Sequence, residues 1–197
     1  MKALDLFCGL GGWSDGLAAE GFEVLGVEIE PHIAELYKHP VIVQDVRDLV
    51  GADFKDYDLI VGSPPCRDFS VLTSFGHLWK VSPDPEGEGM SKVNAFLRIV
   101  KEAEPRFWLM ENVPRLGKYL GKPPRCKPRL SRTMIRAFWG NFPAFLIPKD
   151  ASKGLIWHTQ GKLRSWERAK IPEPVARALG RAVMSHITNN PRKEETD

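Results

Sequence analysis

Strand, helix and strand are predicted in succession within residues 2–28, which have the sequence KALDLFCGLGGWSDGLAAEGFEVLGVE. Lys2–Leu6 is an apolar run that ends in a glycine-rich turn. Trp13–Glu20 then has helical apolar spacing, and Gly21 is suited to end that helix. Phe22–Val27 is apolar again and predicts a second strand. Because strand–helix–strand units join parallel neighbours, this segment predicts a parallel sheet covered by helices.

The same alternation continues as far as residue 110. Helices are predicted at Pro31–Lys38 and Met90–Lys101, and strands at Val41–Val43, Tyr57–Val61 and Arg106–Met110. Short apolar strands separated by helices are typical of a sheet that is buried on both faces. We therefore expect an α/β fold with a doubly wound, mostly parallel, Rossmann-like sheet.

After Pro114 the pattern changes. Residues 117–130 are rich in Gly, Pro, Lys and Arg and predict an irregular basic loop. Thr133–Trp139 and Phe142–Ile147 lie on either side of Gly140-Asn141 and predict a β-hairpin.

Pro172–Ile187 predicts a closing helix, because its apolar residues fall on one face. We find no internal repeat. The expected organisation is a single catalytic domain over residues 1–187, followed by a polar tail at 188–197.

Composition places the chain among ordinary globular proteins. Of its 197 residues, 43% are hydrophobic and 27% are charged. The apolar runs are too short to span a bilayer, so no membrane association is expected. Three cysteines without a CxxC pair argue against a disulfide scaffold and a zinc site. A reducing cytoplasm is the expected location, and no metal is expected.

Charge is unevenly distributed along the chain. Residues 1–60 contain 12 acidic and 4 basic side chains, whereas residues 61–197 contain 13 acidic and 24 basic ones. Between Asn112 and Lys149 there are nine Lys or Arg and no Asp or Glu. Such a block favours a polyanionic partner such as a nucleic acid, although a solvated basic surface would give the same pattern.

Polar or reactive residues follow every predicted strand of the first 112 residues. They are the glycine-rich turn after Leu6, then Glu28, Asp45, Pro64-Pro65-Cys66 and Glu111-Asn112. Ligands of open parallel sheets bind beyond the carboxyl ends of the strands. We therefore expect these residues to converge on one crevice.

The glycine-rich turn and Glu28 predict a nucleoside site. Glycines allow close approach of the backbone to a ligand, and Glu28 lies at a distance suited to ribose hydroxyls. The G-x-G-G spacing departs from the dinucleotide pattern, and no Walker lysine follows. A cofactor without pyrophosphate fits better, which favours S-adenosylmethionine over a nucleotide-dependent oxidoreductase. A tight strand–helix turn alone would also explain the glycines.

Cys66 is the candidate nucleophile, because it follows a strand and two rigid prolines at the expected crevice. Attack requires the thiolate, so nearby positive charge or a helix N-terminus is expected to lower its pKa. The alternative is an inert, packed thiol. Cys8 is expected to be packed beneath the cofactor, and Cys126 has no evident role.

The chain resembles the cytosine-C5 DNA methyltransferases in the order and spacing of its motifs. The resemblance rests on DLFCGLGGWSDGL (5–17), Glu28, Asp45, GSPPCRDFS (62–70) and MENVPRL (110–116), with IPEPVARAL (171–179) similar to the closing motif. It implies a class I S-adenosylmethionine-dependent methyltransferase fold. It also implies methylation of cytosine C5 in DNA through a covalent Cys66–C6 adduct, with base flipping.

The resemblance also implies roles for individual residues. Cys66 would be the nucleophile, Glu111 would hydrogen-bond N3 and the exocyclic amine, and Arg67–Met90 would form a mobile loop over DNA. Phe7 would face the adenine and Glu28 would hold the ribose. Further cofactor contacts would come from Gly9, Leu10, Gly11, Ile29, Asp45, Val46 and Pro65, with Asp45 meeting the adenine amino group.

Three departures from the family pattern stand out. No glutamine–arginine-rich motif follows MENVPRL, so Arg132, and after it Arg136, is the best substitute for the arginine that contacts cytosine O2. Arg168-Ala169-Lys170 replaces the stretch that carries an asparagine in the closing motif. Too few residues follow for a sizeable target-recognition domain. The expected protein is therefore a minimal enzyme that reads little sequence or borrows recognition from a separate partner.

Two alternatives remain beside the DNA enzyme. One is an RNA cytosine-C5 methyltransferase of the same fold, because the catalytic chemistry is shared and the basic block suits either nucleic acid. The other is a cofactor-binding regulatory subunit without catalysis. The departures favour the regulatory subunit, whereas Cys66 and Glu111 argue against it.

Overall fold

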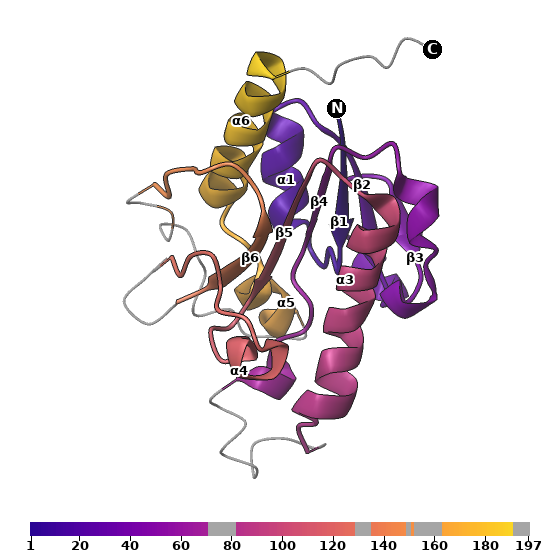
Figure 1. Ribbon diagram of the computed structural model, residues 1–197. Coiled ribbons are helices and arrows are strands. Elements are labelled where there is room, and N and C mark those ends of the chain that lie inside the picture. Colours follow the sequence, from indigo (N-terminus) through magenta and orange to yellow (C-terminus); the bar gives the residue numbers. More distant parts are fainter. Residues whose placement is uncertain (71–81, 129–134, 149–150, 152–162, 191–197) are drawn as a thin grey trace.

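The structure is a computed structural model that describes residues 1–70, 82–128, 135–148, 151 and 163–190. Figure 1 shows a twisted central sheet with helices on both faces. Within the described residues the strands are β1 (Lys2–Leu6), β2 (Glu23–Glu28), β3 (Val41–Val43), β4 (Leu59–Gly62), β5 (Phe107–Asn112) and β6 (Ala137–Asn141).

The strands follow the order β3-β2-β1-β4-β5-β6. β1 to β5 are parallel, and β6 pairs antiparallel with β5. Leu4 at the centre of β1 aligns with Leu25 of β2 and Ile60 of β4. The order reverses beside β1, so the prediction of a doubly wound, mostly parallel sheet is confirmed.

Helices cover the two faces of the sheet with different apolar sets. α1 (Gly12–Ala19) and α6 (Glu173–Asn189) pack on the face that receives Ala3, whereas α3 (Met90–Ala103) packs on the face that receives Leu4. This alternation follows from the two-residue period of a strand. A Cβ at Gly16 of α1 would lie 2.5 Å from the Cβ of Ala176, so α1 and α6 approach very closely.

The remaining helical segments are short. They are α2 (Pro31–Ala34), α4 (Leu116–Leu120), α5 (Arg164–Ala169), the 3₁₀ turns η1 (Val46–Asp48), η2 (Gly51–Phe54) and η3 (Arg67–Phe69), and the π-helical turn η6 (Pro85–Gly89). α2 is shorter than the predicted helix, and α4 forms inside the segment that was predicted to be irregular. No helix in the described ranges is long and apolar enough to cross a membrane.

The predicted hairpin around Gly140-Asn141 is wrong. Both residues belong to β6, where Asn141 aligns with Trp108 and Gly140 with Leu109 of β5. Gly140 has a φ of +147°, and a Cβ there would collide with the Trp108 carbonyl. Glycine is therefore needed here because β5 and β6 approach closely, and not because the chain turns.

The end of the predicted basic loop lies along the outer edge of β6. The amide of Arg125 donates to the Phe138 carbonyl at 2.8 Å, and the amide of Phe138 donates to the Cys126 carbonyl at 3.0 Å. The amide of Arg136 donates to the Pro128 carbonyl, also at 3.0 Å. These bonds satisfy backbone groups that an open sheet edge would expose.

The closing helix is confirmed as α6. Pro172 stands at its N-cap, and the helix continues to Asn189, two residues into the predicted tail. The rest of that tail, residues 191–197, lies outside the described residues.

Candidate active site

A cavity of about 600 Å³ opens at the carboxyl ends of the central strands. Figure 1 shows α5 lying beside these strand ends, and Ser165 and Trp166 of this helix line the cavity. The predicted cofactor residues that line it are Phe7, Gly9, Leu10, Glu28, Ile29, Asp45, Val46 and Pro65, together with Cys66. The predicted convergence is therefore confirmed for the ends of β1, β2, β3 and β4, whereas Glu111 and Asn112 of β5 do not line the cavity.

The glycine-rich turn after β1 has a strained backbone. Phe7, which is not a glycine, has a φ of +61°, and Gly9 has a φ of +51°. Such left-handed conformations persist where the surroundings hold them, and they are common at binding sites. A Cβ at Gly9 would lie 3.4 Å from the Trp166 ring, so α5 covers the turn closely.

Glu28 at the end of β2 is held by two backbone amides. Its Oε2 accepts from the Gly9 amide and its Oε1 from the Glu30 amide, each at 3.0 Å. Only 3% of the residue is exposed, and burial raises the pKa of Glu28. A carboxylate offers about four acceptor positions, so some capacity remains for the hydroxyls of a ligand.

Gly11 is the exception among the predicted cofactor residues. It has a φ of +78° and forms the N-cap of α1. A Cβ there would face Asp15 and Tyr37, each at 3.4 Å. Leu10 and Gly12 line the cavity, but Gly11 does not.

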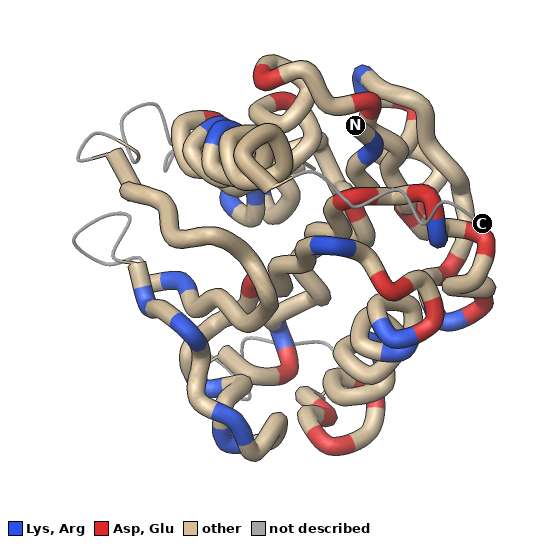
Figure 2. The backbone as a smooth tube through the Cα atoms, turned by 45° about the horizontal axis from the view of Figure 1, so that its top comes forward, with Lys and Arg blue, Asp and Glu red and all other residues tan. Residues whose placement is uncertain are grey.

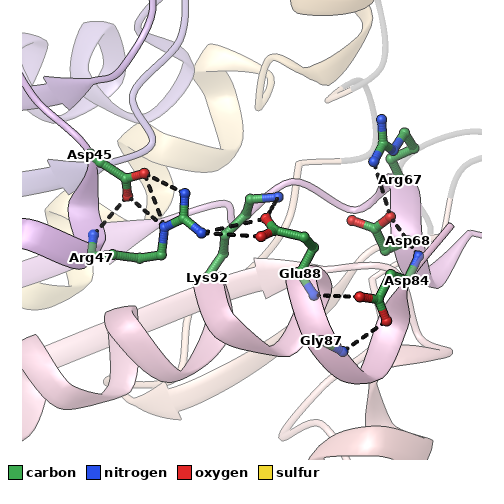
Figure 3. Close-up of polar contacts among 8 residues, drawn as sticks. All are labelled: Asp45, Arg47, Arg67, Asp68, Asp84, Gly87, Glu88 and Lys92. Atoms are coloured by element: carbon green, nitrogen blue, oxygen red, sulfur yellow. Dashed lines mark hydrogen bonds and ion pairs between the residues drawn. The ribbon is translucent and has the colours of Figure 1, made fainter. Parts of the chain in front are cut away.

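Asp45 lines the cavity but is already paired with a neighbour. Its Oδ1 accepts from the Arg47 amide at 2.8 Å, and its Oδ2 lies 2.6 Å from Arg47 Nη2. Arg47 extends further to Glu88, which also pairs with Lys92 of α3 at 3.3 Å (Figure 3). The side-chain hydrogen bond from Arg47 is the main cause that lowers the pKa of Asp45.

Asp68 and Asp84 tie together the two ends of the expected mobile loop. The Asp84 amide donates to Asp68 Oδ1 at 3.2 Å, and Arg67 donates to the same oxygen at 3.3 Å (Figure 3). Asp84 in turn accepts from the amides of Gly87 and Glu88. The middle of that loop, residues 71–81, lies outside the described residues.

Cys66 lies in the segment that follows β4, and Glu111 lies near the end of the neighbouring strand β5. Glu111 forms an ion pair with Arg136 at 3.0 Å, and the side chains of these two residues are 2% and 9% exposed. Arg136 lies just before β6, and the charge of Glu111 raises the pKa of Arg136. Both charges are close enough to influence Cys66.

Asn112 fixes the proline–cysteine segment to β5. Its Nδ2 donates to the Pro64 carbonyl at 2.8 Å, and its Oδ1 accepts from the Val113 amide at 2.9 Å. The side chain is fully buried, so both ends of the amide are satisfied without water. Asn112 thereby sets the position from which Cys66 faces the cavity.

The expectation of a lowered pKa for Cys66 is wrong. Burial raises the pKa of the thiol, Glu111 raises it further, and Arg136 only partly opposes them. Cys66 precedes η3, a single turn, and its side chain is partly buried. The sequence places Cys66 next to polar residues but does not show this desolvation.

Two arginines were candidates for contact with the base. Arg132, the first choice, lies outside the described residues. Arg136, the second, is brought to Glu111 and donates to the Arg168 carbonyl at 3.3 Å. Its Nε is buried without a hydrogen-bond partner among the described residues.

Sequence reasoning did not assign Trp13, Ser63 or Trp166 to the cavity. Trp13 donates to Ser63 Oγ at 3.1 Å, and both line the cavity with Trp166 and Lys170. Lys170 lies in the stretch that replaces part of the closing motif, and the proximity of that motif is the only signal in the sequence for Trp166. The described residues contain no cluster of His, Cys, Asp and Glu that would hold a metal.

Sequence comparison finds relatives among DNA-modifying enzymes. The Type II methyltransferase M1.HphI of Haemophilus parahaemolyticus is 36% identical over 125 residues, which cover 57% of this chain and 32% of that protein. M.HgiGI of Herpetosiphon aurantiacus, also named a Type II methyltransferase, is 34% identical over 127 residues, covering 58% of this chain and 92% of that sequence. This chain spans about a third of the length of M1.HphI.

Among solved structures, the magnesium protoporphyrin IX methyltransferase of Synechocystis is similar with a TM-score of 0.44 and 16% identity. The alignment covers 70% of this chain and 67% of that one. The family model for C-5 cytosine-specific DNA methylases matches residues 1–122. This match covers more than half of the chain and includes the glycine-rich turn, Cys66 and Glu111, so the chain belongs to the C-5 cytosine-specific DNA methylase family.

Proposed function

We propose that this protein transfers a methyl group from S-adenosylmethionine to C5 of cytosine in DNA. The observation that carries the proposal is the placement of Cys66 at the cavity, with the buried Glu111–Arg136 pair close enough to influence its pKa. A nucleophile, a hydrogen-bonding carboxylate and a cation thus meet beside a nucleoside-sized cavity. This set matches the needs of cytosine chemistry.

The cavity suits the cofactor in size and in donor set. About 600 Å³ lies within the range of small-molecule sites. Glu28 keeps acceptor positions for ribose hydroxyls, and Phe7, Ile29 and Val46 supply apolar surface for the adenine. Asp45 accepts from the adenine amino group in this proposal, with Arg47 keeping its carboxylate ionised. When bound, S-adenosylmethionine supplies a methyl group activated by a positively charged sulfur.

Cys66 activates the base by adding to it. The thiolate forms a bond to C6, the C5–C6 double bond opens, and the electron pair makes C5 nucleophilic toward the methyl group. After the methyl group is on C5, water or hydroxide from solvent takes the C5 proton; the electrons of the C5–H bond restore the double bond, and the C6–S bond breaks to release the thiolate. Because burial raises the pKa of the Cys66 thiol, the proposal also requires that the thiol proton passes to solvent before the sulfur adds to C6.

Glu111 stabilises the charge that develops on the base. In the proposal its carboxylate hydrogen-bonds N3 and the exocyclic amine, which favours protonation of N3 as Cys66 adds. Arg136 holds this carboxylate in place, and its Nε–H, which has no partner among the described residues, donates to the base in the proposal. Since the site lies at strand ends inside a cavity, the cytosine must leave the duplex to reach it.

DNA is proposed to bind across the basic surface formed by α4 and the residues that follow it. The lower left of Figure 2 carries Lys and Arg with almost no Asp or Glu. Lys118 of α4 and Lys122 and Lys127, which follow it, are exposed. Arg125 instead stacks on Phe142, with its guanidinium 4.5 Å from the ring centre. Described residues after β5 mainly complete the sheet and line one wall of the cavity, so we propose that most recognition of the target sequence comes from outside them.

The deciding assay measures transfer of labelled methyl from S-adenosylmethionine to duplex DNA and to bulk tRNA, with mass analysis of the nucleosides. We expect 5-methylcytosine in DNA. Label found only in tRNA would identify RNA as the substrate. Label in neither, with cofactor bound, would refute catalysis by this chain alone and would favour the requirement for a partner or the regulatory subunit. Cys66→Ala should abolish transfer, whereas Cys126→Ala, which alters an exposed thiol, is the matched control.

A second experiment tests the covalent step directly. In DNA that contains 5-fluorocytosine, the fluorine cannot leave as a proton does, so the Cys66–C6 bond should persist and appear in an intact-mass spectrum. Glu111→Gln should slow adduct formation with little loss of DNA affinity. An adduct on Cys66→Ala would refute the assignment of the nucleophile.

A further inference from the structure

The cofactor and the cytosine are proposed to bind to different parts of the sheet. The glycine-rich turn after β1 and the ends of β2 and β3 line the cofactor end of the cavity. Cys66 lies in the segment after β4, and the Asn112 side chain ties this segment to β5, the strand of Glu111. The nucleophile and its carboxylate are therefore held together by β4 and β5, whereas the proposed methyl-donor site is built by β1, β2 and β3.

Backbone hydrogen bonds join these two groups of strands only as far as the sheet extends. The pairing of β1 with β4 ends with Leu6 opposite Gly62. Just after this pair, the amide of Cys8 donates to β2 at 2.9 Å, so the glycine-rich turn is bonded to β2. Within the described ranges, no backbone hydrogen bond joins residues 7–12 to residues 63–66. A direct hydrogen bond between these loops therefore has to come from a side chain.

Trp13 and Ser63 make that connection. The indole of Trp13, in the first turn of α1, donates from Nε1 to Ser63 Oγ at 3.1 Å, and both residues line the cavity. Trp13 comes directly after the glycine-rich turn and the first residue of α1, and Ser63 lies in the segment that leads to Cys66. In the part of the chain that the structure describes, this is the one hydrogen bond between residues 7–13 and residues 63–66.

The indole that makes this bond is held firmly by its surroundings. Trp13 is 2% exposed and belongs to the same apolar cluster as Leu17 and Phe138. The ring centres of Trp13 and Phe138 are 5.9 Å apart, and Phe138 aligns with Glu111 in the pairing of β5 and β6. A ring packed in this way cannot rotate freely, so its N–H has a defined direction. Trp13 therefore touches both the segment of the nucleophile and the strand opposite its carboxylate.

We propose that Trp13 is a positioning residue that aligns the methyl donor with the cytosine through its hydrogen bond to Ser63. The inference rests on the proposed function, which places the donor at the glycine-rich turn and the base at Cys66. Methyl transfer requires the donor sulfur, the methyl carbon and C5 to lie in line at close range, and a displacement of about 1 Å can cost up to about a hundredfold in rate. Cofactor binding and the addition of Cys66 to C6 do not need this alignment.

A matched comparison is available at a second buried indole. Trp139 Nε1 donates to the Lys122 carbonyl, also at 3.1 Å, and Trp139 is 5% exposed. Trp139 does not line the cavity. Because a buried indole usually has a hydrogen-bond partner wherever it lies, Trp139→Phe measures the cost of losing such a bond outside the site.

Two rates measured on the same DNA separate alignment from base activation. The first is transfer of labelled methyl from S-adenosylmethionine. The second is release of tritium from C5 of cytosine with S-adenosylhomocysteine bound, which involves no methyl group. In that exchange the Cys66 thiolate bonds to C6, a proton from water bonds to C5, and loss of the tritium to water as a triton restores the double bond and expels the thiolate.

Trp13→Phe and Ser63→Ala remove the same hydrogen bond from its two sides. Each should lower kcat of methyl transfer at least about tenfold, while the KM for S-adenosylmethionine and the rate of tritium release stay within about twofold of the wild-type values. The double variant should be no slower than the slower single variant, because the bond can be lost only once. Retained tritium release also shows that a variant is folded.

Two control variants define the expected contrast. Trp139→Phe should leave both rates within about twofold of wild type at saturating DNA. Asn112→Ala should slow tritium release as well as methyl transfer, because its bond to the Pro64 carbonyl positions Cys66 itself.

The inference is overturned by any of three results. One is an unchanged kcat in Ser63→Ala, and another is a parallel loss of both rates in that variant, which leaves the core intact. The third is a loss of kcat in Trp139→Phe as large as in Trp13→Phe, since any buried indole bond would then have the same effect. If the wild-type protein releases no tritium and transfers no methyl group to DNA, catalysis by this chain alone is refuted, and the positioning role with it.

Discussion

Replacing Arg136 by methionine should destabilise the protein strongly, and a second substitution at Glu111 should restore part of the loss. Arg136 and Glu111 are 3.0 Å apart, with side chains 9% and 2% exposed. Removal of one partner of such a pair leaves a buried charge without compensation and costs about 3–5 kcal/mol. For a urea m-value of about 2 kcal/mol per M, the unfolding midpoint should fall by about 2 M.

The double variant Arg136→Met, Glu111→Gln removes both charges. It should be only about 1–2 kcal/mol less stable than the wild-type protein, since a neutral amide tolerates this site better than a lone carboxylate. Glu111→Gln should therefore destabilise the wild-type protein but stabilise the Arg136→Met variant. Urea unfolding of all four proteins, followed by circular dichroism, measures this reversal. If Glu111→Gln lowers the free energy of unfolding equally in the wild-type protein and in the Arg136→Met variant, the energetic coupling between Glu111 and Arg136 is refuted.

Asp5→Asn should flatten the pH dependence of stability between about pH 4 and pH 7. Burial raises the pKa of Asp5 from 3.8 to about 7. Between these pH values the folded protein therefore keeps a proton that the unfolded chain releases. As the pH rises across this window, the free energy of unfolding of the wild-type protein falls by roughly 1 kcal/mol per pH unit. An unchanged slope in urea titrations of the variant would contradict this. Asn112→Ala should lower kcat at least tenfold with little change in cofactor affinity, because it removes the hydrogen bond to the Pro64 carbonyl that positions Cys66. An unaltered kcat would disprove this positioning role. Changing Lys118, Lys122 and Lys127 to Gln should reduce the log–log salt slope of DNA binding by up to about 2.7, whereas the matched change of the exposed Lys38, Lys55 and Lys101 should not. Equal slopes for the two triple variants would assign the basic surface no role.

Most of the sheet and of the cavity could be predicted from the sequence, because both depend on local patterns. The strand from Lys2 to Leu6 and the residues that follow each strand are visible as apolar periodicity and as polar strand ends. Gly140-Asn141 resembles a turn locally, but its strand pairs with β5, and that pairing depends on tertiary contacts that periodicity does not contain. The raised pKa of Cys66 has the same origin, since burial depends on neighbours distant in sequence.

The close approach of α1 and α6 also bears on how the protein is made. Residues 12–19 leave the ribosome well before residues 173–189, which provide the surface that covers them, including Ala176 opposite Gly16. The apolar face of α1 therefore stays exposed until α6 is synthesised, and the cavity wall formed by α5 is completed only shortly before α6. Nascent chains are thus expected to depend on holding chaperones until α6 emerges and docks.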